Sequence, residues 1–180
     1  MNIDEDFLKS KIRDVPDFPK KGIIFKDITP LLLDHEAFSY AIQQILDKVK
    51  DKKIDVVASA ESRGFILGAV LAYELKAGFV PLRKPGKLPY KTIKQEFQTE
   101  YSTDTFEVHE DAIKKGQNVL IVDDLIATAG TMVAAINLVK KLGGKVTECI
   151  VIIELPDLHG REKIENEECE LFSLIQFEGD

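Results

Sequence analysis

The sequence predicts an α/β fold in which helices flank a mostly parallel sheet. Short apolar or β-branched runs alternate along the chain with segments in which apolar residues recur at helical spacing. The apolar runs are continuous, as in strands that are covered on both faces. A long, polar, lysine-rich stretch at 83–110 interrupts this alternation and contains only short β-like pieces.

The expected elements follow from these patterns in chain order. Helical periodicity predicts helices at 5–13, 35–50, 63–76, 131–142 and 158–165. Continuous apolar runs predict strands at 54–60, 78–82, 118–123, 145–154 and 171–176. The stretch 83–110 is expected to be a mobile loop, because loops of that length are usually functional lids or disordered.

Length and composition indicate one globular domain, 1–180. With 180 residues, 44% hydrophobic and 31% charged, the chain can bury one core but is too short for two ordinary domains. A net charge of −7 disfavours nucleic acid or an anionic membrane as the main partner. No apolar run approaches the length of a membrane span, and the N-terminus lacks a signal-peptide core.

The two cysteines suggest a reducing compartment, because they are isolated and lack metal-ligand spacing. Cys149 lies in an expected strand, and Cys169 lies in an acidic stretch that is expected to be exposed. His35, His109 and His159 are scattered and also lack metal-ligand spacing, so they are expected to be structural or surface residues. A cytoplasmic protein is expected.

Residues 118–132, NVLIVDDLIATAGTM, join a buried strand to the start of a helix. Ligands bind at such junctions in open α/β sheets. The backbone N–H groups from Ala127 to Thr131, the helix dipole and the hydroxyls of Thr128 and Thr131 suit a phosphate. The string contains neither GxGxxG nor a P-loop lysine, which disfavours dinucleotide and ATP binding.

Asp123 and Asp124 would repel a phosphate unless a cation or hydroxyl groups lay between them. A ribose diol or Mg²⁺ fits that requirement, so a sugar phosphate with free hydroxyls is the expected ligand. The alternative is structural: the carboxylates end a strand, and Thr128 or Thr131 caps the next helix. That alternative is favoured for either aspartate alone, whereas the complete string favours the ligand site.

Two further clusters have both a functional and a structural interpretation. Ser62 and Arg63 follow an apolar strand and open a helix, so this segment is a second anion site or an ordinary N-cap. The basic cluster after the strand 78–82 is either a diphosphate clamp or a solvated surface. It comprises Arg83, Lys84, Lys87 and Lys91.

The string at 118–132, which contains Asp123 and Asp124, resembles the phosphoribosyl-pyrophosphate (PRPP) motif of type I phosphoribosyltransferases. Its ATAGT ending is similar to that of the adenine-specific branch of the family. The resemblance covers almost the whole chain. Further matching blocks are DFPKKGIIFKDITPLL at 17–32, ESRGF at 61–65, RKPGKLP at 83–89, TEYSTDTFEVHEDAIKKG at 99–116 and ELPDLHGREKI at 154–164. One residue departs from the pattern: Ala129 replaces the second glycine that is usual in the family.

The resemblance implies a type I phosphoribosyltransferase fold, with an N-terminal hood at about 1–34, a core at about 35–180 and a catalytic loop at about 83–110. It implies purine salvage, in which adenine and PRPP give AMP and pyrophosphate. Mg²⁺ is implied as the cofactor, bound through pyrophosphate and water with no direct protein ligand. A homodimer is also implied, with the helix from Arg63 to Tyr73 at its interface.

Site residues carry over from the matching motifs. The resemblance implies catalytic roles for Glu100, Asp123, Asp124 and Arg83. It implies adenine binding by Ile24, Phe25, Lys26 and Leu155. It implies contacts to PRPP or AMP by Ser62, Arg63, Arg83, Lys84, Lys87, Tyr101, Asp123, Asp124, Ala127, Thr128, Ala129, Gly130 and Thr131. A cis peptide bond between Glu61 and Ser62 is implied as well.

Two alternative functions remain at this point. One is a related enzyme that uses hypoxanthine, guanine or xanthine. The other is a non-enzymatic regulator that binds PRPP or a nucleotide on the same fold. The regulator is disfavoured because the sheet, its helices and the hood use up the 180 residues that an appended binding module would need.

Overall fold

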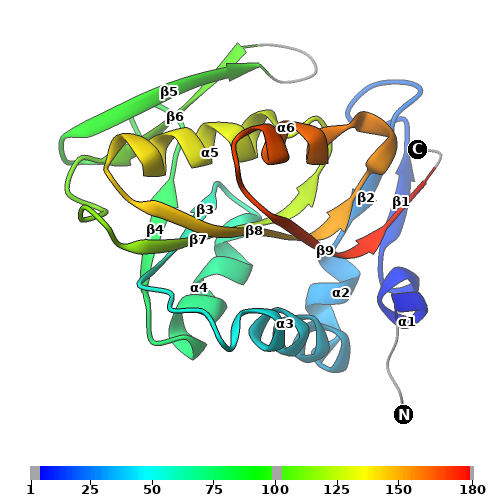
Figure 1. Ribbon diagram of the computed structural model, residues 1–180. Helices are drawn as coiled ribbons and strands as arrows, with labels where there is room; N and C mark the ends of the chain where they lie inside the picture. The colour runs from blue at the N-terminus through cyan, green and yellow to red at the C-terminus, as the bar shows by residue number, and fades with distance from the viewer. Residues whose placement is uncertain (1–4, 99–102, 179–180) are drawn as a thin grey trace.

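The computed structural model describes residues 5–98 and 103–178. Its centre is a five-stranded sheet with strand order β4-β3-β7-β8-β9, in which every neighbouring pair is parallel (Figure 1). The strands are β3 (Val56–Ala60), β4 (Gly78–Leu82), β7 (Asn118–Ile126), β8 (Lys145–Glu154) and β9 (Leu171–Gln176). The α/β class with a parallel sheet is therefore confirmed.

Helices cover both faces of this sheet. Helices α3 (His35–Val49) and α4 (Gly64–Glu74) lie on one face, and α5 (Gly130–Lys141) and α6 (Gly160–Asn166) lie on the other (Figure 1). Within the described ranges, no helix has both the length and the apolar character needed to cross a bilayer.

Successive residues of each central strand pack into two separate hydrophobic clusters. In β3, Val57 joins the cluster of α3 and α4, whereas Ala58 joins that of α5. In β8, Ile150 and Val151 divide in the same way. Side chains alternate across a strand, so a strand covered on both faces is apolar at most positions. This requirement explains the continuous apolar runs.

The N-terminal region contains the predicted first helix, α1 (Glu5–Ser10), and three small elements that the sequence analysis did not predict. These are β1 (Arg13–Pro16), β2 (Ile24–Asp27) and α2 (Thr29–Leu33). The antiparallel pair β1-β2 is separate from the central sheet. Four-residue strands are too short to show a recognisable period, and the first helix ends at Ser10 instead of 13.

A two-stranded antiparallel hairpin occupies much of 83–110, where only short β-like pieces were expected. Its strands are β5 (Thr92–Gln98) and β6 (Thr103–His109). Phe97 and Phe106 are buried in the α5 cluster, and their rings are 4.7 Å apart. The hairpin therefore has one apolar face. Its apolar residues are too few among the polar ones for the alternation of a β-strand to be recognised in the sequence. Mobility of this segment stays a prediction.

Strand β7 and Cys169 also differ from expectation. The strand continues to Ile126 instead of ending at 123, because β8 pairs with it as far as Glu154. The two aspartates therefore lie within the strand. Cys169 is buried, not exposed, and belongs to the same hydrophobic cluster as Cys149.

Close packing of α4 on the sheet generates a stability prediction. A Cβ added at Gly68 would lie 2.1 Å from Ser59 Oγ and 2.8 Å from the Phe79 ring. We predict that Gly68→Ala lowers the free energy of unfolding by about 1–3 kcal/mol in chemical denaturation, because overpacking outweighs the better helix propensity of alanine. Gly78→Ala is the control, since the nearest atom would be 3.8 Å away. Equal stability of the Gly68→Ala variant and the wild-type protein would contradict this packing.

Candidate active site

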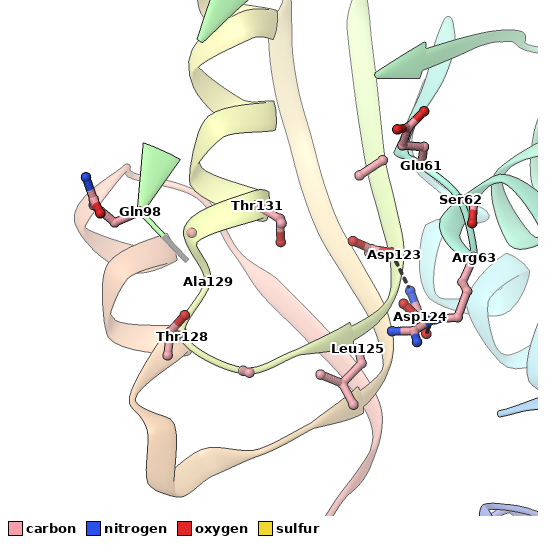
Figure 2. A pocket seen from close by; sticks show the side chains of 13 residues that line it. Glu61, Ser62, Arg63, Gln98, Asp123, Asp124, Leu125, Thr128, Ala129 and Thr131 are labelled. Atoms are coloured by element: carbon pink, nitrogen blue, oxygen red, sulfur yellow. Dashed lines mark hydrogen bonds and ion pairs between the residues drawn. The ribbon is translucent and has the colours of Figure 1, made fainter. Parts of the chain in front are cut away.

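A cleft of about 540 Å³ lies at the C-terminal ends of β3 and β7 (Figure 2). Parallel strands bring these ends to one edge of the sheet, where α/β proteins bind ligands. The lining residues come from three segments that follow or end these strands and from the end of β5. They are Ala60, Glu61, Ser62, Arg63, Gln98, Asp123, Asp124, Leu125, Ala127, Thr128, Ala129, Gly130 and Thr131.

A carboxylate pair lies on the β7 side of the cleft. Asp123 Oδ1 accepts a hydrogen bond from the Asp124 N–H at 2.9 Å, and Arg63 Nε lies 2.5 Å from Asp124 Oδ2. Burial raises the pKa of Asp123 well above its ordinary value, and the neighbouring Asp124 raises it further. The site therefore favours a cation or hydroxyl donors, which would stabilise the ionised carboxylates.

The loop from Ala127 to Thr131 forms the opposite wall of the cleft and leads into α5. Ala129 is the N-cap residue, is 3% exposed and has a left-handed backbone with φ 65°. A left-handed backbone is strained for alanine, and it costs about 1 kcal/mol more than it would for the glycine that is usual in the family. No side chain caps α5, so Thr128 and Thr131 do not serve as its N-cap. Their hydroxyls are left for a ligand.

Two neighbouring elements contact the loop 127–131 on the side away from the cleft-lining carboxylates. Lys163 Nζ, on α6, donates to the carbonyl oxygen of Thr128 at 2.9 Å. A Cβ at Gly130 would lie 2.1 Å from the carbonyl oxygen of Gln98, so the end of β5 abuts the loop directly. The hairpin and the phosphate loop are therefore in backbone contact.

The segment between β3 and α4 forms the facing wall. The bond between Glu61 and Ser62 is cis, as the family resemblance implies. The N-cap residue of α4 is Arg63, without a side-chain cap hydrogen bond, so Ser62 is not the N-cap. Glu61 accepts a hydrogen bond from Arg83 Nε at 2.9 Å. This ion pair joins the segment to the end of β4.

The basic cluster lies beside the cleft rather than in its lining. Lys84 Nζ pairs with Asp104 Oδ2 on the hairpin at 2.9 Å, and this hydrogen bond raises the pKa of Lys84. Lys87 is exposed, and its carbonyl accepts from Arg83 Nη1 at 3.4 Å. Of the cluster, Arg83 thus has a direct side-chain link to the cleft, through Glu61.

The hood places an aromatic ring next to the cleft. The Arg63 guanidinium carbon lies 4.8 Å from the centre of the Phe25 ring, which also packs edge-on against Phe18 at 5.1 Å. Ile24 is 43% exposed. The Lys26 ammonium is buried against Asp14, at 2.9 Å, and the Phe177 ring, so it lies away from Phe25.

Leu155 follows β8 directly, and its N–H donates to the carbonyl oxygen of Ile126 at 3.0 Å. It is half-buried beside the start of the phosphate loop and does not line the cleft. Glu100 and Tyr101, assigned to the catalytic loop, lie outside the described residues.

The site residues assigned from the sequence leave out four that line the cleft. Ala60 and Leu125 are apolar, Glu61 was named only for its cis bond to Ser62, and Gln98 ends a strand within a polar stretch. Strand ends were the available signal, since β3 and β7 carry Ala60 and Leu125 at the edge where ligands bind. Gln98 had no such signal, because the hairpin itself was not predicted.

Comparisons with known proteins agree with this geometry. The family model of the phosphoribosyl transferase domain matches residues 32–179. The adenine phosphoribosyltransferase of Thermotoga maritima is 58% identical over 158 residues, which cover 88% of this chain and 91% of the relative.

Solved structures extend the likeness to nearly the full length. The crystal structure of adenine phosphoribosyltransferase from Thermoanaerobacter pseudethanolicus has a TM-score of 0.91 at 50% identity, covering 96% of this chain and 99% of that one. The Giardia lamblia enzyme complexed with 9-deazaadenine has a TM-score of 0.93 at 38% identity, covering 98% and 99%. With strong identity over most of both chains, this chain belongs to the adenine phosphoribosyltransferase family.

Proposed function

We propose that this protein transfers the phosphoribosyl group of PRPP to adenine, forming AMP and releasing pyrophosphate in purine salvage. The observation that carries this proposal is one cleft that joins a carboxylate pair to a phosphate loop. The family supports the same activity, because its Giardia lamblia member was solved with the adenine analogue 9-deazaadenine.

The loop 127–131, which we call the phosphate loop, and the carboxylate pair bind different parts of the sugar phosphate. The N–H groups from Ala127 to Thr131 and the two threonine hydroxyls bind the 5′-phosphate at the start of α5. Asp123 and Asp124 accept hydrogen bonds from the ribose hydroxyls. As the anomeric carbon loses its leaving group, positive charge grows on the ribose, and the adjacent carboxylates stabilise it.

The segment between β3 and α4 binds the leaving pyrophosphate. Ser62 and the backbone around it bind the diphosphate, and Arg63 and Arg83 supply positive charge once they exchange their carboxylate partners for phosphate oxygens. Lys84, Lys87 and Tyr101 complete this side when the catalytic loop closes. Closure excludes the water that would otherwise hydrolyse the reactive sugar.

The carboxylate pair fits the implied Mg²⁺ cofactor, because hard oxygen ligands suit this ion, and burial, followed by the neighbouring Asp124 carboxylate, raises the pKa of Asp123 in the absence of a cation. The described ranges contain no group of three metal-ligating side chains. As the family resemblance implies, Asp123 and Asp124 would hold the ion through water, and pyrophosphate would supply its direct ligands. When bound, Mg²⁺ neutralises charge on the diphosphate.

The hood and the end of β8 form the adenine site. Phe25 stacks on one face of the purine and Leu155 contacts the other, with Lys26 contributing through its backbone beside them. The backbone C=O and N–H around Ile24 match the amine and ring nitrogen of adenine. Glu100 handles the proton of the base.

A homodimer is proposed on the basis of the family and of α4. Ile66 and Tyr73 are 45% and 81% exposed, and they lie seven residues apart on the same face of this helix. Large exposed apolar side chains on one face favour a protein interface. The two buried free thiols, Cys149 and Cys169, support the proposed cytoplasmic location, where thiols stay reduced.

The base specificity provides the main test of the function. We predict that kcat/KM for adenine exceeds that for hypoxanthine by about 10⁴-fold at saturating PRPP and Mg²⁺, because hypoxanthine would leave backbone groups of the adenine site unpaired. Initial rates of nucleotide formation with adenine, hypoxanthine, guanine and xanthine measure this ratio. Comparable values for adenine and hypoxanthine would contradict the proposal, and PRPP binding without turnover would favour a regulator.

Asp123→Asn should separate activity from stability. We predict a loss of kcat/KM of about 10- to 100-fold, which corresponds to one charge-assisted hydrogen bond of roughly 1.5–3 kcal/mol. The same variant should have a higher Tm at pH 7. The folded-state pKa of Asp123 lies above the ordinary 3.8, so its ionisation lowers the stability of the wild-type protein as pH rises through that window.

The stability gain of Asp123→Asn should therefore shrink when Tm is measured at pH 4. Asp124→Asn is the matched control: it should also lose activity, but its change leaves Arg63 without its 2.5 Å partner, so no gain in Tm is expected. An Asp123→Asn variant with wild-type kcat/KM would refute the role of Asp123 in binding the ribose.

Glu100→Gln tests the proton transfer. We predict that kcat falls about 10²-fold or more while the KM for PRPP changes little, as expected when an acid/base group is lost. Steady-state kinetics with both substrates distinguishes the two parameters. A full kcat with a raised KM for PRPP would make Glu100 a binding residue instead.

A further inference from the structure

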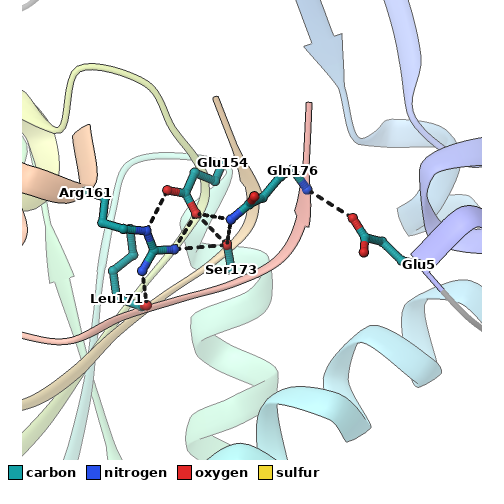
Figure 3. Close-up of polar contacts among 6 residues, drawn as sticks. All are labelled: Glu5, Glu154, Arg161, Leu171, Ser173 and Gln176. Carbon is teal, nitrogen blue, oxygen red and sulfur yellow. Dashed lines mark hydrogen bonds and ion pairs between the residues drawn. The ribbon is translucent and has the colours of Figure 1, made fainter. Parts of the chain in front are cut away.

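A carboxylate that none of the proposed roles uses is buried at the end of β8. Glu154 is 3% exposed and accepts four hydrogen bonds, two from Arg161 and one each from Ser173 and Gln176 (Figure 3). The donors Arg161 Nε, Arg161 Nη2, Ser173 Oγ and Gln176 Nε2 lie at 2.9, 2.5, 2.6 and 3.1 Å. Burial acts to raise the pKa of Glu154, but the bonds from Arg161 and Ser173 hold it below its ordinary value.

The partner Arg161 is equally well bound. It reaches Glu154 from α6 with two nitrogens of its fork, and its third, Nη1, donates to the carbonyl oxygen of Leu171 at 2.7 Å. Such two-pronged pairing fixes an orientation as well as a distance, which a lysine cannot do. Replacing a buried ion pair by apolar residues is often neutral or stabilising, so stability alone is a weak reason for this one.

The pair closes the segment between its two members, 155–160, into a loop beside the cleft. At one end, the Leu155 N–H is bonded to Ile126, the last residue of β7. At the other end, Gly160 lies so close to Ala127 that an added Cβ would be 2.2 Å from the Ala127 carbonyl oxygen. Leu155, the proposed purine contact, is thus held between Glu154 and the end of the central strand.

We propose that the Glu154–Arg161 pair positions Leu155 against the purine, so that Arg161 is a positioning residue for adenine binding. The inference rests on the proposed adenine site. The loop 127–131 also has a support that does not involve α6, because Gln98 at the end of β5 abuts Gly130. Loss of the pair should therefore weaken the binding of adenine and leave that of PRPP largely unchanged.

The test uses Arg161→Lys, which keeps the charge but loses the two-pronged geometry, and Ser173→Ala, which removes one donor to Glu154 without leaving a charge unpaired. The KM for adenine, the KM for PRPP, kcat and Tm are measured for each. Arg161→Lys should raise the KM for adenine about 10-fold, with kcat and the KM for PRPP within about two-fold, because a small misplacement of a contact mainly affects the ligand that it touches. Ser173→Ala should have a smaller effect in the same direction.

Lys140→Met is the matched control. Lys140 Nζ donates to the carboxylate and the carbonyl of Glu167 at 2.8 and 2.9 Å, so it also fastens α6 but at the end away from Leu155. It should lower Tm without changing either KM. An unchanged KM for adenine in Arg161→Lys and Ser173→Ala would overturn the inference. So would a rise of the KM for adenine and the KM for PRPP by the same factor in proportion to a loss of Tm, because that result would indicate general destabilisation. If the wild-type protein forms no AMP, the proposed function fails instead.

Discussion

The placement of two adjacent carboxylates within the central strand β7, with Asp124 buried and Asp123 half-buried, is the constraint around which the cleft is organised. Asp124 is 4% exposed, and burial makes ionisation of Asp123 unfavourable. Paired ions of this kind are tolerated only with compensation, which Arg63 supplies to Asp124. Phe25 then packs on the same guanidinium, so the hood is tied to the charge balance of the core.

Much of the central fold could be predicted from the sequence, because strands covered on both faces are apolar over most of their length. β8 is the clearest case: its ten residues were predicted at both ends. The hood strands and the hairpin could not be predicted in the same way. β6 buries Phe106 and Val108 on one face and carries polar, mostly half-buried residues on the other, so its composition resembled that of a loop.

The site was predictable where a local motif contains it and unpredictable where the fold assembles it. The loop around Thr128 and the cis bond at Glu61 follow from matched strings. The contact of Gln98 with Gly130 depends on a tertiary approach of the hairpin to α5 that no spacing in the sequence records. The left-handed Ala129 lies between these cases, since a missing glycine marked the position and the structure determined its backbone.

The strand order has a consequence for how the chain folds. β7, β8 and β9 are sheet neighbours that follow one another in sequence, whereas β3 pairs with β7 only after β4 and the whole hairpin have intervened. Closing such a long loop costs entropy before any contact offsets it, so we expect β3 to pair with β7 after the sequential pairings within each half have formed. The two walls of the cleft come from opposite sides of this divide. A chain in which β3 has not yet paired with β7 would thus have the phosphate loop without the segment between β3 and α4 that faces it. Ligand binding would therefore require the β3–β7 pairing to be complete.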